Sequence, residues 1–202
     1  FCFILVTSLL SCNNNKSPSV ENISLDDLEL KRGDLLLCGD PNFGEVDFSL
    51  SCRYDLREKF NLGLTLIHSF EYAEAEKVFV SILDQDKDCV MAYWATAMSI
   101  LNHPLSFRQN PESLKRGEEL LNVAKTLIVN NEREKDYLDA VSIYFKDWQN
   151  LDTQTRKLKY ESKMEELYLK YQDDVETAVF YSLAVLATAE LNDKTYSKQK
   201  KS

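Results

Sequence analysis

Residues 60–86 decide the fold of this chain and read FNLGLTLIHSFEYAEAEKVFVSILDQD. Gly63 and Ala75 place small residues on two segments that have the apolar periodicity of helices. Small residues at such positions let two antiparallel helices approach closely. Larger apolar residues are then expected to fill the seam between the helices, namely Leu62, Leu66, Phe79 and Ile82. The stretch therefore predicts an antiparallel helix hairpin.

The spacing of Gly63, Leu66, Ala75 and Phe79 resembles that of a tetratricopeptide repeat, in which a helix pair recurs about every 34 residues. One hairpin cannot bury its apolar faces alone, so the resemblance implies neighbouring hairpins. We predict an all-α fold, a tetratricopeptide-type right-handed α-solenoid of antiparallel hairpins with a short irregular or extended N-terminal cap. The solenoid is expected over residues 59–202, with hairpins at 59–86, 89–129, 132–171 and 175–202, the last incomplete.

The second predicted hairpin departs from the repeat spacing. If Ala97 takes the small position of the first helix, the small position of the second helix is expected at 109. Gly117 carries that pattern instead, with Pro111 starting the helix, which indicates an insertion within NHPLSFRQNP at 102–111. Insertions between repeat helices map to one face of a solenoid and often to its binding face. Drift of a loop without function is the alternative.

The N-terminal residues 1–12, FCFILVTSLLSC, predict an export signal. Their apolar run is too short to span a bilayer and matches the apolar region of a signal peptide. Residues 9–12 resemble a bacterial lipobox, which implies that Cys12 carries a lipid anchor in the cell envelope, in the periplasm or at the outer membrane. A plain secretory signal or a buried helix is the alternative. Because Phe1 lies inside the apolar run, we expect the chain to be a piece of a longer protein.

Residues 13–30 are predicted to form a polar tether and residues 31–58 an irregular cap. Helix formation in the cap is interrupted by Gly33, Gly39, Pro41 and Gly44. Val46, Phe48 and Leu50 alternate with polar neighbours, which predicts a short extended segment that leans on the first hairpin. We expect this segment to cover the open apolar end of the solenoid.

Several stretches resemble a group of exported bacterial tetratricopeptide-repeat proteins whose biochemical role is poorly defined. These stretches are HSFEYAEAEKVF, CVMAYWATAMSI, NHPL, KDYLDAVSIYF and DDVETAVFYSLAVLATA. The likeness runs from about residue 38 to residue 198. The proteins of this group look longer than this chain, which implies that the chain is an N-terminal portion. Glu71 and Asn102 stand where similar proteins carry an aromatic residue, so aromatic surface is reduced there.

The five cysteines are sorted by their positions. Cys2 lies in the signal and Cys12 is the lipidation candidate, which leaves Cys38, Cys52 and Cys89. In an oxidising compartment two of these three would pair. A hairpin returns the chain to its start, so Cys52 before the first helix and Cys89 after the second lie at one end. We therefore favour a Cys52 to Cys89 bridge, then Cys38 to Cys52, with reduced, buried cysteines as the alternative.

The two histidines, His68 and His103, fall near the ends of adjacent helices that would line the concave groove of a solenoid. A metal site there would need two further ligands, from acidic residues of the inserted loop or from Cys38. No HxH, HExxH or CxxC spacing supports one, so we predict no metal and no cofactor. The histidines stay candidates for groove binding, as do the aromatic residues Trp94, Phe107, Tyr144 and Trp148. Packing in the core is the alternative for these rings.

Composition and motifs limit the function classes. A net charge of −9 leaves no basic stripe that could bind phosphates, so nucleic acid is excluded as a partner. The sequence contains no Gly-rich phosphate loop and no GxSxG motif, so we predict no enzyme activity. We expect a scaffold that binds a protein or peptide. The alternatives are a SusD-like lipoprotein that captures glycans or nutrients, and a metal-handling protein or the N-terminal part of a longer envelope enzyme. The sequence leaves the oligomeric state open.

Overall fold

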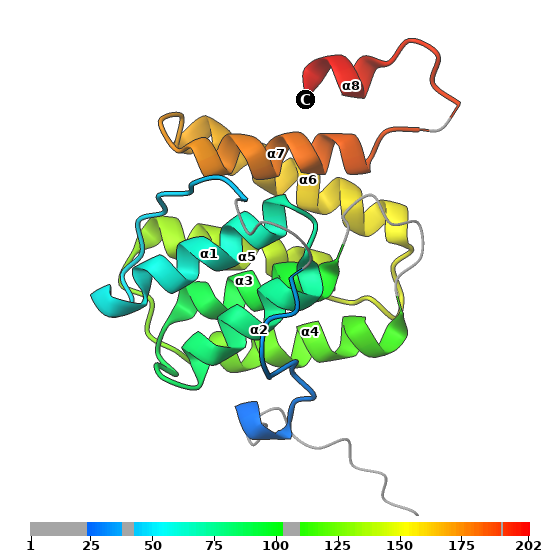
Figure 1. Cartoon of the computed structure of the whole chain (residues 1–202). Coiled ribbons are helices and arrows are strands. Elements are labelled where there is room, and N and C mark those ends of the chain that lie inside the picture. The colour runs from blue at the N-terminus through cyan, green and yellow to red at the C-terminus, as the bar shows by residue number, and fades with distance from the viewer. Residues whose placement is uncertain (1–23, 38–42, 103–109, 191) are drawn as a thin grey trace, which may run out of the picture.

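The computed structural model describes residues 24–37, 43–102, 110–190 and 192–202. This part of the chain is all-α and contains no strand. Eight α-helices follow one another and each packs against the next (Figure 1). Their bounds are α1 Arg57–His68, α2 Tyr72–Leu83, α3 Val90–Leu101, α4 Pro111–Ala124, α5 Glu132–Phe145, α6 Thr153–Lys170, α7 Val175–Ala187 and α8 Ser197–Lys201. Two short 3-10 helices, η2 Leu25–Asp27 and η3 Tyr54–Leu56, precede them.

The α1 and α2 pair confirms the predicted hairpin and its close approach. A Cβ atom added to Gly63 would lie 2.4 Å from Cζ of Phe79, so only a residue without a side chain fits against that ring. Phe79 is fully buried, as are Leu66 and Ile82. The prediction for Leu62 is wrong, because this side chain is 37% exposed and faces away from the seam.

The remaining helices begin where the sequence supplies caps. Asn110, Asn131, Asp152 and Asp174 each accept a hydrogen bond from a backbone N–H in the first turn that follows. Pro111 occupies the first turn of α4, where its missing N–H costs nothing. A second close approach joins α4 to α5, since a Cβ on Gly117 would lie 2.1 Å from the Phe145 ring.

The helices α1, α3, α5 and α7 share one side of the molecule. Helix α3 contacts both α1 and α5, and side chains of α7 reach α1 and α3. We call the surface that these four helices present to one another the inner face. Helices α2 and α4 pack on the outside of this layer, against their neighbours in the chain (Figure 1).

Residues 24–37 run along α2 and belong to the folded part. Leu25, Leu28 and Leu30 are buried in the core cluster, and the N–H of Lys31 donates to Oε1 of Glu76 at 3.0 Å. The prediction of a polar tether that extends to residue 30 is therefore wrong for residues 24–30. Three leucines alternating with acidic residues supply enough apolar surface to pack, although the overall composition of the stretch is polar.

None of the helices in the described ranges is both long enough and apolar enough to cross a membrane.

Candidate functional site

Residues 43–51 place the side chain of Phe48 in the inner face. This ring is 1% exposed and its centroid lies 5.4 Å from that of Phe60 on α1, 6.1 Å from Trp94 on α3 and 5.7 Å from Tyr137 on α5. The alternation of Val46, Phe48 and Leu50 was expected to cover the end of the array. The predicted contact with the first hairpin is confirmed, because Phe48 packs against Phe60 of α1. The prediction of an end cap is wrong, because the same ring also packs against α3 and α5.

Side chains of α1 and α5 hold the backbone of this segment. The N–H of Phe48 donates to Oδ1 of Asn61 at 3.1 Å, and Arg133 donates to the carbonyl of Ser49 at 2.9 Å. Both the N–H and the hydroxyl of Ser51 donate to the carboxylate of Glu134 at 2.5 Å. The Arg133 guanidinium also lies 4.2 Å from the centroid of the Phe48 ring, within range of a cation–π interaction.

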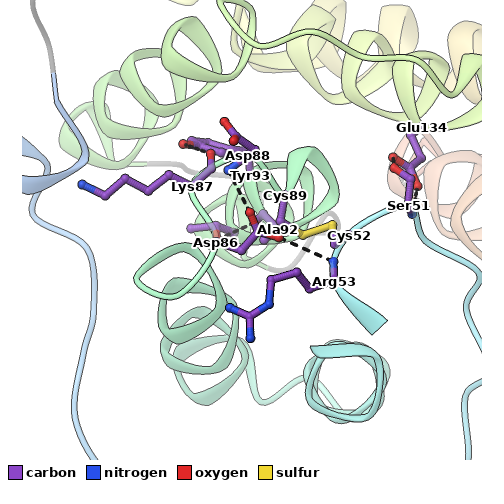
Figure 2. The surroundings of a disulfide bond; sticks show 11 residues. Ser51, Cys52, Arg53, Asp86, Lys87, Asp88, Cys89, Ala92, Tyr93 and Glu134 are labelled. Carbon is purple, nitrogen blue, oxygen red and sulfur yellow. Dashed lines mark hydrogen bonds between the residues drawn. A yellow bond between two sulfur atoms is a disulfide. The ribbon is translucent and has the colours of Figure 1, made fainter. Parts of the chain in front are cut away.

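A disulfide fixes the end of the segment. Cys52 is bonded to Cys89, whose Cα lies 4.9 Å away at the start of α3, which confirms the bridge favoured from the sequence. Figure 2 shows that Ser51, beside the disulfide, points toward Glu134, and that Arg53 lies against the turn before α3. The N–H of Arg53 donates to Asp86 at 3.5 Å. The segment is thus joined to α3 covalently and to α5 by hydrogen bonds.

Helix α7 closes the other side of the inner face. Nε2 of His68 on α1 lies 2.9 Å from Oε2 of Glu176 on α7, and the Phe180 ring packs edge-on against Trp94 at 5.1 Å. The inner face is therefore filled with aromatic side chains and is not an open groove. Trp94, at its centre, is 1% exposed and its indole N–H has no hydrogen-bond partner among the described residues.

A charged pair borders this cluster. Asp174 accepts a hydrogen bond from Nε of Arg133 at 2.6 Å and from the Tyr137 hydroxyl at 3.0 Å. Burial raises the pKa of Tyr137 well above its ordinary value, and the charge of Asp174 raises it further. Tyr137 therefore stays a neutral donor that positions Asp174 at the start of α7.

The predicted groove residues have different fates. Trp94 and Tyr144 are buried, so the expectation that their rings line an accessible groove is corrected for both. Trp94 packs against Tyr137 and Tyr144 against Tyr160, on neighbouring helices. Trp148 is half-buried and donates to Glu118 at 3.0 Å, on α4 and away from the inner face. His68 lies at the edge of the inner face, paired with Glu176.

Four other candidates fall outside the described residues, namely Cys12, Cys38, His103 and Phe107. The pairing of His68 with His103 therefore stays a prediction. Among the residues that the structure does describe, no group of three or more histidine, cysteine or acidic side chains could hold a metal ion.

An open hollow of about 820 Å³ lies beside the segment, and we call it the rim hollow. Residues 45–51 form one wall, residues 170–176 between α6 and α7 form the other, and Asn131 and Arg133 contribute from the start of α5. The sequence alone does not predict this site, because residues 170–176 look like an ordinary helix connection. The signal that was available is the acidic pair Asp173 and Asp174 at a helix start.

Comparison of the chain with protein-family models, characterised proteins and solved structures finds no match.

Proposed function

We propose that this protein is a non-catalytic, tetratricopeptide-type scaffold that binds a protein or peptide partner in the bacterial cell envelope. In this proposal the lipid on Cys12 is its attachment to the membrane. The repeat architecture is supported by the two glycine positions, Gly63 against Phe79 and Gly117 against Phe145, where successive helices approach closely. The export signal and the lipobox support the location.

The observation that carries the proposal is the rim hollow. This hollow lies against a segment whose own backbone is held by side chains of α1 and α5. This side of the molecule thus holds an extended chain by hydrogen bonds to its backbone, which come from the side chains of Asn61, Arg133 and Glu134. A partner segment that enters the hollow would meet both backbone groups and charged side chains.

Site-specific photocrosslinking tests the proposal. A photoreactive amino acid at Gln172, which lines the rim hollow and is exposed, is compared with the same substitution at Gln149, an exposed glutamine between α5 and α6. In cells that express the protein natively, we expect a discrete crosslinked partner from position 172 and none from position 149. The absence of any product, or identical products from both positions, would contradict partner binding at this surface.

A further inference from the structure

The charges around the rim hollow define the chemistry of a partner. Resting on the proposed function, we infer that the segment of the partner that occupies the hollow is an extended, basic peptide with an apolar side chain between its basic residues. The inference follows from three features of the hollow: its free carboxylates, its exposed apolar side chains and its unoccupied backbone groups.

The free charges in the hollow are negative. Both of its cationic residues are already neutralised, because Arg133 pairs with Asp174 at 2.6 Å and Lys170 with Glu132 and Asp136, each at 2.7 Å. The carboxylates of Glu45 and Asp173 are exposed and form no ion pair within the described ranges. They belong to the two different segments that line the hollow, so lysine or arginine side chains of an entering segment would find an opposite charge on each segment.

The same two segments also contribute apolar side chains to the hollow. Val175, the first residue of α7, is 72% exposed. Val46, Leu50 and Tyr171 are partly buried and also line the hollow. An apolar side chain of the partner can therefore remove water from this strip while its basic neighbours reach the walls.

The wall formed by residues 45–51 also offers backbone groups. In the part of the chain that the structure describes, no hydrogen bond joins the main-chain N–H or C=O groups of Glu45, Val46 or Asp47 to another residue. Residues 46–50 alternate between exposed and more buried side chains, as an extended chain does. A second extended chain can pair with such free groups, which favours a peptide over a folded helix as the occupant.

The test uses an array of nine-residue peptides with an apolar central residue and with flanking positions that vary from all lysine to all glutamate. The wild-type protein is compared with Glu45→Lys/Asp173→Lys and with a control of equal charge, Glu58→Lys/Asp139→Lys, whose carboxylates are exposed and outside the hollow. A further set carries N-methyl groups on alternate backbone amides. The unfolding temperatures of the variants verify that each is folded.

We expect the wild type and the control to select the basic peptides. The double substitution in the hollow should lower the ratio of basic to acidic peptide binding by about tenfold. N-methylation should weaken binding to the wild type. Equal binding of basic and acidic peptides by the wild type would overturn the inference. An equal preference for basic peptides in both double variants would also overturn it. If a partner crosslinks at Gln172 while no basic peptide binds, the inference fails and the proposed function stands; if neither occurs, both fail.

Discussion

The segment before the first helix and the last helix are attached to the rest of the protein by different physical means. Residues 43–52 are fixed to α1, α3 and α5 by a disulfide, by a fully buried ring and by hydrogen bonds to the buried carboxylate of Glu134. Helix α8 has no buried residue and is attached through ion pairs of Lys198 with Glu161 and Lys201 with Glu165 (Figure 1). Salt does not screen a disulfide or a buried ring, whereas it screens an exposed ion pair such as Lys201 with Glu165. Of the α8 ion pairs, only that of Lys198 has a buried carboxylate, that of Glu161. We therefore expect the inner face to unfold with the whole protein and α8 to open on its own.

Removal of the disulfide should produce the largest loss of stability. The two cysteines are separated by 37 positions in the sequence, and Cys52→Ser/Cys89→Ser opens the loop that they close. For a loop of this size the chain-entropy model predicts a loss of about 4 kcal/mol in the free energy of unfolding. Urea unfolding followed by circular dichroism measures this change. If the urea midpoint of the wild type is the same with and without reductant, the disulfide does not contribute as described.

Truncation of the inserted ring comes next. Phe48→Ala should lower the free energy of unfolding by about 3 kcal/mol, because it leaves a cavity among Phe60, Trp94 and Tyr137. Leu36→Ala is the matched control, since Leu36 lies on the same N-terminal stretch and is 76% exposed. Equal effects of the two substitutions in urea unfolding would show that Phe48 is not inserted.

A smaller loss is expected where helices meet at a glycine. Gly63→Ala and Gly117→Ala each place a methyl group against a buried ring, and each should cost about 2 kcal/mol through overpacking. In an exposed helix the same substitution stabilises by improving helix propensity. Unchanged or higher urea midpoints for both variants would contradict the close approach.

Lys201→Ala tests the other end of the comparison and should have the smallest effect. Its partner Glu165 and the lysine itself are both largely exposed, so the midpoint of global unfolding should not change measurably. Hydrogen exchange in α8 should become faster in this variant and in high salt. Slow exchange in α8 that matches that of α3 would contradict the separate opening of this end.

Local patterns in the sequence were sufficient to predict the helices and the disulfide. The spacing of Gly63 and Phe79 and the return of a hairpin to its start depend on residues close in sequence. The path of Phe48 and the filling of the inner face depend on contacts between distant segments. The pairing of His68 with Glu176, 108 residues apart, depends on how α7 packs beside α1, which no local pattern specifies.

The most direct test of the closed inner face is the accessibility of Trp94. In a Trp148→Phe variant, Trp94 is the single tryptophan that remains, and acrylamide quenching of its fluorescence reports contact with water. The structure predicts blue-shifted emission and weak quenching, both of which are lost when Phe48→Ala is added. Emission at the wavelength of a hydrated indole, with strong quenching in the presence of Phe48, would show that the inner face is open and contradict this account.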